Sequence, residues 1–233
     1  LTMGYHDSIN FNKLPIPFAC VSANVVNGDQ IVFHDGVLST AMRASMAIPG
    51  VFTPVRKDSM ILVDGGIVNN YPADVAKAMG ADIETVSQTI EGGESRADLL
   101  VRYSHLKGTV IEGDTIPTLI DEIPMIAVVA AFAEGTTIIK DAAELKVKES
   151  NRIDTVTENL KRMGADVTPT EDGMIIHGNR DSLHEADFES YLDHRIAMSF
   201  AVAALALPEN CHMKDAECVN ISYPTFYKDL TGL

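Results

Sequence analysis

The chain has 233 residues, of which 46% are apolar and 22% charged, and a formal net charge of −15. That length and balance suit a globular protein of one or two domains. The charge is unevenly placed: residues 1–82 hold 5 Lys or Arg against 7 Asp or Glu, and residues 83–233 hold 13 against 26. An acidic surface argues against nucleic acid and anionic membranes as partners, so an anionic ligand would need a local basic cluster.

The sequence shows no targeting or membrane signal. The longest apolar run, residues 123–133, contains Pro124 and is about half of the ~20 residues that a membrane span needs. No charged-then-apolar segment opens the chain. The three cysteines lack metal or redox spacing, so we expect reduced thiols in a cytoplasmic protein, with no metal and no cofactor.

Residues 1–82 alternate short strands and short helices. Two strands, 17–26 and 28–35, meet at an Asn-Gly-Asp turn, which is a strong hairpin signal. A helix of small residues follows at 39–50, and a buried strand at 60–66 delivers Asp64 onto a turn containing two glycines. A short helix at 71–80 ends at a glycine. Taken alone, Asp64 is most simply a turn residue.

The order of these features resembles the patatin-like phospholipase family. The resemblance covers residues 5–82 and rests on three motifs: LPIPF, A-x-R-A-S-M-A-I-P-G-V-F and L-V-D-G-G-x-x-N-N-x-P. It implies a fragment of a lipid acyl hydrolase fold in which Asp64 is the aspartate of a Ser–Asp dyad. No serine of the chain stands in the G-x-S-x-G elbow that such a nucleophile needs, and the nearest string surrounds Ser95. We therefore expect no ester hydrolysis.

Residues 83–233 alternate strands with longer helices. The pattern predicts βαβαββ-like units of an α/β fold. The expected strands are 97–102, 136–142, a hairpin of 166–170 with 173–178, and 218–224. Helical runs are expected at 116–135, 148–164 and 192–207, with the helices themselves near 121–134, 150–163 and 193–206. In the second helix Ile153, Val156, Leu160 and Met163 form an apolar stripe.

Charged residues gather at the starts of these three helices. Asp121 is most simply a helix cap, and Lys148 and Arg152 would share one face if both were helical, with Glu149 beside them. Arg195 stands with His194 before a long apolar run, where a solvated basic face explains it poorly. A cation at a helix N-terminus opposes the helix dipole, so such a site often binds an anion.

The same segments resemble the C-terminal half of 5-enolpyruvylshikimate-3-phosphate (EPSP) synthase, over residues 78–233. The motifs are residues 106–127, the run from FAEGTT to ESNRID at 132–154, KRMGAD at 161–166, DHRIAM at 193–198 and SYPTF at 222–226. The resemblance implies a partial inside-out α/β barrel built of βαβαββ units. It also implies phosphoenolpyruvate and shikimate 3-phosphate as substrates.

The resemblance assigns a role to each charged residue. Asp121 would orient or deprotonate the sugar hydroxyl, Glu149 would shuttle the methylene proton, and Lys148 is a second acid–base candidate. Arg152 and Arg195 would hold the phosphoenolpyruvate carboxylate and phosphate through charge-assisted hydrogen bonds. His194 would lie on the phosphate or behind these residues.

The chain departs from the family pattern at several positions. Asn151 stands where an aspartate is usual, Leu192 where a glycine precedes Asp-His-Arg, and Ile221 where many members carry a lysine. The Lys-Ser and G-D-x-S-S segments that supply most shikimate 3-phosphate contacts do not occur in these 233 residues.

One string occurs twice, as KAMGAD at 77–82 and KRMGAD at 161–166. The first copy is typical of both families, so we expect a seam there, with a patatin-like fragment at 1–82 and an enolpyruvyl transferase-like domain at 83–233. Three functions remain open: an incomplete, inactive EPSP synthase domain, a lipid acyl hydrolase without its serine, and a folded non-catalytic composite.

Overall fold

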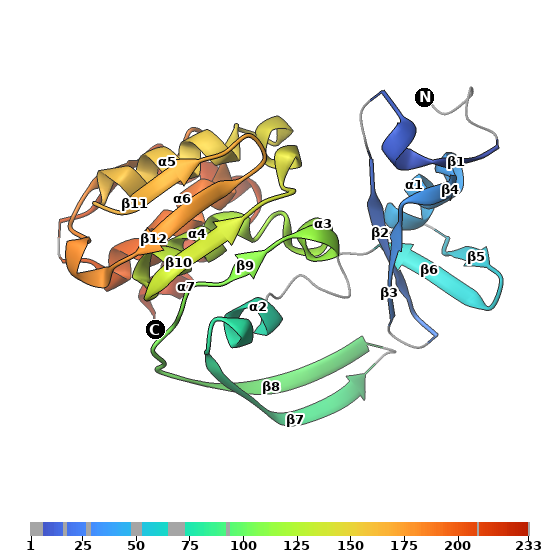
Figure 1. The fold of residues 1–233 in the computed structure, drawn as a ribbon. Coiled ribbons are helices and arrows are strands. Elements are labelled where there is room, and N and C mark those ends of the chain that lie inside the picture. The colour runs from blue at the N-terminus through green and yellow to red at the C-terminus, as the bar shows by residue number, and fades with distance from the viewer. Residues whose placement is uncertain are drawn as a thin grey trace. The chain divides into compact units, whose positions relative to one another are not determined.

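The computed structural model describes residues 7–15, 18–26, 29–47, 53–64, 73–91, 94–208 and 210–232 (Figure 1). The chain divides into two compact units. The first consists of Leu1–Tyr71, Gln88–Arg96 and Pro117–Leu119, and the second of Pro72–Ser87, Ala97–Ile116 and Ile120–Leu233.

Unit 1 is built on an antiparallel four-stranded sheet in the order β3-β2-β6-β5. Its strands are β2 (Cys20–Asn24), β3 (Asp29–Phe33), β5 (Val55–Lys57) and β6 (Met60–Asp64). The predicted pairing of the first two strands is confirmed, with Ser22 opposite Ile31. The Asn-Gly turn that joins them lies outside the described residues.

A helix and a second, smaller sheet complete unit 1. The further elements are β1 (Ser8–Asn10), η1 (Phe11–Lys13), β4 (Asp35–Val37) and α1 (Leu38–Ser45). The helix buries Leu38, Ala41 and Ala44 together with Phe11 and Leu62. The buried alanines let α1 lie close to the sheet, as the small-residue pattern predicted. Burial raises the pKa of the Cys20 thiol to about 11, so this thiol is protonated and inert at neutral pH.

Unit 2 contains a complete βαβαββ arrangement. Its elements are β9 (Val110–Ile111), η3 (Gly113–Thr115), α4 (Ile123–Phe132), β10 (Gly135–Ile139), η4 (Ala143–Val147), α5 (Arg152–Arg162), β11 (Asp166–Pro169) and β12 (Met174–Gly178). The short helix α3 (Ile116–Leu119) lies between η3 and α4 in the chain, and its residues 117–119 belong to unit 1. The sheet order is β11-β12-β10-β9, with β9 and β10 parallel and the other neighbours antiparallel. The predicted stripe of α5 is confirmed, because Ile153, Val156, Leu160 and Met163 are all buried.

A second βαβ arrangement follows. Its elements are β13 (Asp187–Glu189), α6 (His194–Ala206) and β14 (His212–Lys214), and the chain continues through η5 (Arg180–Ser182) before them and η6 (Ala216–Ile221) and α7 (Phe226–Thr231) after them. The strands β13 and β14 are parallel.

The strand predicted at 218–224 is wrong. Residues 216–221 form a 3₁₀ helix, in which the neighbours Cys218 and Val219 are both buried and pack together with Ala197 of α6.

The helix expected near 121–134 is confirmed as α4, but the whole apolar run predicted at 116–135 is not one helix. It is two helices, since Gly113–Leu119 and Ile123–Phe132 are bent by 111° relative to one another. Pro124 falls in the first turn of α4, where its missing N–H costs no hydrogen bond. Within the described residues no single helix is long and apolar enough to cross a membrane, and this bent pair passes only by length and composition.

The repeated string ends two helices in the same way. After α2 (Ala73–Ala78), Gly80 N–H donates to Lys77 O at 2.9 Å and Ala81 N–H to Ala76 O at 2.9 Å. After α5, Gly164 N–H donates to Lys161 O and Ala165 N–H to Leu160 O, both at 3.0 Å. The two glycines have φ of +96° and +85°. This is the Schellman pattern, which requires the left-handed conformation that glycine adopts most readily.

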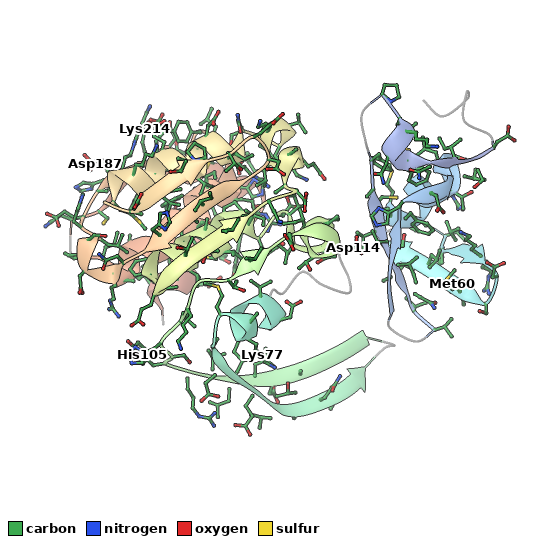
Figure 2. The ribbon with its side chains drawn as sticks, in the orientation of Figure 1. Met60, Lys77, His105, Asp114, Asp187 and Lys214 are labelled. Atoms are coloured by element: carbon green, nitrogen blue, oxygen red, sulfur yellow. The ribbon has the colours of Figure 1, made fainter. Side chains whose placement is uncertain are left out.

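The segments after these helix ends also correspond. A pair of strands follows each one: β7 (Asp82–Glu91) with β8 (Glu94–Arg102), and β11 with β12. The chain then returns to the helix end, where Lys107 N–H donates to Met79 O at 2.8 Å and His184 N–H to Met163 O at 3.0 Å. Figure 2 labels Lys77 in α2 and His105 in the first return segment. The sequence repeat is therefore a repeated α-β-β structure, in which residues 88–96 at the ends of β7 and β8 are counted in unit 1.

Candidate active site

The starts of α4, α5 and α6 come together in unit 2. The three helices contact one another in pairs, and side chains just before each helix join across the gap. Arg152 at the start of α5 contacts Asp121 before α4 and Asp193 before α6, and Arg195 of α6 contacts Glu122. The charged residues that the sequence places at three separate helix starts thus form one network.

Arg152 is the centre of this network. Its Nε donates to Asp193 Oδ2 at 2.9 Å, its Nη1 to Asp121 Oδ1 at 2.8 Å and its Nη2 to Glu149 Oε2 at 2.7 Å. The Arg152 side chain is 1% exposed and that of Asp193 is 0% exposed. Burial lowers the pKa of Arg152, but the hydrogen bonds and charge of Asp193 outweigh it and hold the pKa above the ordinary value.

Asp193 has two structural tasks. Its Oδ1 accepts the backbone N–H of Arg195 at 2.9 Å and so caps α6, and its Oδ2 accepts from Ser150 Oγ at 2.9 Å as well as from Arg152. Burial raises the pKa of Asp193, but the bonds from Arg152 and Ser150 outweigh it and lower the pKa overall. Asp193 is not among the site residues predicted from the sequence, although an aspartate directly before an apolar helix is an N-cap signal.

Asp121 does not cap α4, so the simplest interpretation of that residue is wrong. The N-cap position of α4 is Glu122, and no side chain forms a cap hydrogen bond there. Burial raises the pKa of Asp121, but Lys148, Arg195 and Arg152 together outweigh it and lower the pKa. The side chain is 42% exposed and ionised at neutral pH.

The remaining charged residues of the network lie around Arg152 and Asp121. Lys148 Nζ lies 2.7 Å from Glu144 Oε1 and 3.7 Å from Asp121 Oδ1. Arg195 Nη1 lies 2.7 Å from Glu122 Oε1. Lys148 is not helical, because it has φ −76° and ψ −163° after η4. The shared helix face considered for Lys148 and Arg152 therefore does not exist, and a turn brings the two cations to Asp121 instead.

The network carries an excess of negative charge. Its cations are Lys148, Arg152 and Arg195, and its carboxylates are Asp121, Glu122, Glu144, Glu149 and Asp193. The formal charge of these groups is −2, and each cation already has a carboxylate partner. His194, the first residue of α6, is half-buried beside them. An anionic ligand must therefore exchange with carboxylates that are already in place.

Unit 1 presents a different arrangement around Asp64. The backbone of Asp64 ends β6, whereas its side chain and the following Gly-Gly turn lie outside the described part of the chain. Its Cα is paired with that of Ser22 in β2, whose buried Oγ has no hydrogen-bond partner among the side chains that the structure describes. Ser22 stands inside a strand rather than on a sharp strand–helix turn, and Ser95 lies within β8. The described residues thus contain no nucleophile elbow for Asp64.

A metal site is not formed by the part of the chain that the structure describes, where no three His, Cys, Asp or Glu side chains are grouped to hold an ion. Arginine and lysine dominate the cationic side of the network, and these residues suit carboxylate and phosphate ligands.

The βαβαββ arrangement with charged residues at three helix starts defines an α/β protein of the enolpyruvyl transferase type. Comparison with known proteins is specific: the family model "EPSP synthase (3-phosphoshikimate 1-carboxyvinyltransferase)" matches residues 45–230. The chain belongs to the EPSP synthase family.

Relatives and solved structures agree with this assignment. The 3-phosphoshikimate 1-carboxyvinyltransferase of Bacillus velezensis is 42% identical over 219 residues, covering 91% of this chain and 50% of the relative. That of Oceanobacillus iheyensis is 51% identical over 192 residues, covering 82% and 43%. The structure of EPSP synthase from Acinetobacter baumannii matches with a TM-score of 0.67 and 31% identity, covering 83% of this chain and 53% of that one. The enolpyruvyl transferase NikO from Streptomyces tendae shares the fold, with a TM-score of 0.51 and 19% identity.

The chain spans about half the length of the curated relatives that it matches. A second family model, patatin-like phospholipase, matches residues 7–77. The two matches therefore share residues 45–77, upstream of the seam expected at 77–82.

Proposed function

We propose that the network around Arg152 is the phosphoenolpyruvate-binding half of an EPSP synthase-type site. The observation that carries this proposal is the difference in burial among the carboxylate partners of Arg152. Asp193 is fully buried and fixes one edge of the guanidinium, whereas Asp121 and Glu149 are half-exposed and occupy its outward N–H groups.

The outward partners can be exchanged for a ligand at modest cost. Half-exposed carboxylates regain hydration when they are displaced, and their ion pairs are worth little in solvent. Glu122, the partner of Arg195, is only 14% exposed, so its displacement by a ligand costs more than that of Asp121 or Glu149. A ligand with a carboxylate and a phosphate, such as phosphoenolpyruvate, can engage Arg152 and Arg195 at once through paired N–H groups, an arrangement that selects planar and tetrahedral oxyanions.

The carboxylates and the lysine then fit the transfer reaction of the family. The sugar hydroxyl adds to C2 of phosphoenolpyruvate as a proton is delivered to C3, and loss of phosphate with a proton from the new methyl group restores the double bond. Asp121, kept ionised by three cations, would orient the hydroxyl and accept its proton. Glu149 and Lys148, on the turn before α5, would exchange the proton at C3.

We expect these 233 residues alone to bind phosphoenolpyruvate weakly and not to catalyse transfer to shikimate 3-phosphate. The ligand meets a network of formal charge −2, and the shikimate 3-phosphate contacts implied by the family lie in segments that these residues do not include. A dissociation constant of about a millimolar, or about −4 kcal/mol, is expected. Without an oriented sugar the proximity contribution to the rate is lost.

Titration with phosphoenolpyruvate at low salt, followed by NMR or calorimetry, tests the proposal. Arg195→Ala should weaken binding at least several-fold. Arg162→Ala is the matched control, because Arg162 is equally exposed, at 32% against 31%, and pairs with Glu158 away from the network. Equal affinity of both variants and the unmodified chain would show that the anion binds elsewhere and would defeat the proposal.

The patatin-like match leads us to propose a composite chain with its seam at 77–82, rather than a working hydrolase. Asp64 has no serine in a G-x-S-x-G elbow, and the serine paired with it by register is buried in the sheet. Residues 1–82 would then be a fragment that contributes fold but no chemistry, joined to the transferase domain at 83–233.

A further inference from the structure

Among the described residues, β8 and β14 are strands with one unpaired edge whose places in the complete four-stranded sheet are taken by strands paired on both edges. In the complete sheet, β12 lies between β11 and β10, and β10 lies between β12 and β9. By contrast β8 pairs only with β7, and β14 pairs only with β13. Unpaired N–H and C=O groups along such edges can accept another strand.

The internal repeat shows that β8 corresponds to β12. Lys107 and His184 make the same backbone bond to the helix end, and they are 77 residues apart. His105 O and Ser182 O, again 77 residues apart, are the nearest atoms to a Cβ built at the two helix-stop glycines. Applied to the strands, this offset places Leu99 of β8 at the position of Ile176 of β12.

The same offset shows that β14 corresponds to β10. It matches Ile111 of β9 with Phe188 of β13, and both side chains are buried. Ile111 pairs with Ile139 of β10, and Phe188 pairs with Met213 of β14, both in parallel. Met213 therefore takes the place of Ile139. Figure 2 locates this small sheet through Asp187 in β13 and Lys214 in β14.

We propose that the free edge of β8 binds β14 of a second copy of this chain. In the complete sheet, β10 runs antiparallel to β12, with Ile139 opposite Met174 and Thr137 opposite Ile176. The repeat transfers this register to the contact between copies. Its three pairs are Met213 with Ala97, His212 with Asp98, and Cys211 with Leu99.

The chemistry of the two edges supports this occupant. On β8, Leu99 is 38% exposed, whereas its counterpart Ile176 in β12 is buried, and the neighbouring Leu100 and Val101 are 42% and 57% exposed. His212 would face the carboxylate of Asp98, where an imidazole and a carboxylate can share a hydrogen bond. Each copy supplies one edge of each kind, so the two edges complement one another.

This contact joins two different surfaces, so it yields rings or longer chains rather than an isologous dimer. The net charge of −15 per copy opposes association, and salt above about 0.15 M screens that repulsion. The mass measured by light scattering should therefore rise above 25.2 kDa with protein concentration, and more so in salt.

The register can be tested by disulfide trapping on the full chain. Leu99→Cys should form a disulfide with Cys211 of a second copy on mild oxidation, giving a ladder on a non-reducing gel. Leu100→Cys is the matched control, because the neighbouring residue points to the opposite face and should crosslink at least about tenfold less. Leu99→Cys with Cys211→Ser should give no ladder. Cys20 and Cys218 are buried, so they do not compete.

The proposal fails if the chain stays at 25 kDa at all concentrations and salts tested. It also fails if Leu99→Cys and Leu100→Cys crosslink equally. Association that persists in Leu99→Lys, which places a charge on the edge, would locate the interface elsewhere. An N-terminal fragment of an EPSP synthase can also be added to the chain. If the chain binds that fragment but stays monomeric, the β8 edge pairs with a strand of the fragment, and pairing between copies is overturned.

Discussion

Replacement of Asp193 by asparagine should destabilise unit 2 more than any other single carboxylate change in the site. The side chain lies fully buried against the guanidinium of Arg152, which is also buried. Removing one partner of a buried ion pair costs about 3–5 kcal/mol, because the other charge is left uncompensated. Asparagine can still cap α6 through its oxygen, so the loss of the cap, worth about 1 kcal/mol, is not added.

The structure places the expected cost at the lower end of that range. Arg152 keeps its bonds to Asp121 and Glu149, so about 3 kcal/mol is expected for Asp193→Asn. Asp193→Ala also removes the cap at Arg195 N–H, so about 4 kcal/mol is expected for that variant. Either value is a large share of the 5–15 kcal/mol that stabilises a typical domain.

Urea unfolding followed by far-UV circular dichroism measures this, since the chain has no tryptophan. With a slope of about 2–3 kcal/mol/M, Asp193→Asn should lower the midpoint by about 1 M or more. Glu158→Gln is the control, because it breaks a half-exposed Arg–Glu pair four residues apart on α5, worth about 0.5 kcal/mol or less. Equal midpoints for the two variants would refute the view that Asp193 holds a desolvated charge.

Three further outcomes are expected. Leu192 has φ +59° and is 69% exposed, so Leu192→Gly should raise the free energy of unfolding in urea by up to about 1 kcal/mol. Leu205→Gly is the control, because Leu205 is 62% exposed within α6, and it should lower the free energy of unfolding by about 1 kcal/mol. The opposite order would disprove backbone strain at Leu192. Burial raises the pKa of Asp193, but Arg152 lowers it by more, so the pKa in the folded chain lies below its ordinary value. The contribution of Asp193 to the free energy of unfolding is therefore complete above about pH 4 and lost as the pH falls through the depressed pKa. An equally steep loss of stability in acid for Asp193→Asn would contradict this. The chain should not cleave short-chain esters above background, and activity abolished by Asp64→Ala would reveal a nucleophile, with Ser95 and Ser45 the first to replace.

Local patterns predicted most elements of unit 2. The spacing of four apolar residues was enough to predict α5, because this apolar stripe is the buried face of the helix. The residues are Ile153, Val156, Leu160 and Met163. The start of α4 was predictable, because Pro124 fits the first turn of a helix. The short helix α3 before it was missed, since four residues carry too little pattern to show a separate helix.

The candidate site was predictable only in part. A charged residue at a helix start is visible in the sequence, but its partner is not: Arg195 reaches Glu122 across 73 residues and Arg152 reaches Asp193 across 41. Family resemblance supplied Asp121, Glu149 and Arg152 as a group. The role of Asp193 follows from burial, which depends on how three helices pack and is absent from any short window of sequence.

The repeated helix stop follows from what comes after each helix. In both copies the left-handed glycine turns the chain into a strand, a second strand follows, and the returning segment donates to the carbonyl of the methionine before the glycine. At Gly164 a Cβ would lie 2.5 Å from Ser182 O, so the close approach of the return requires glycine there. At Gly80 the corresponding oxygen is 3.7 Å away, so the backbone conformation is the stronger constraint. Neither requirement involves the residues before the helix, which is why two unrelated lead-ins can end in the same string.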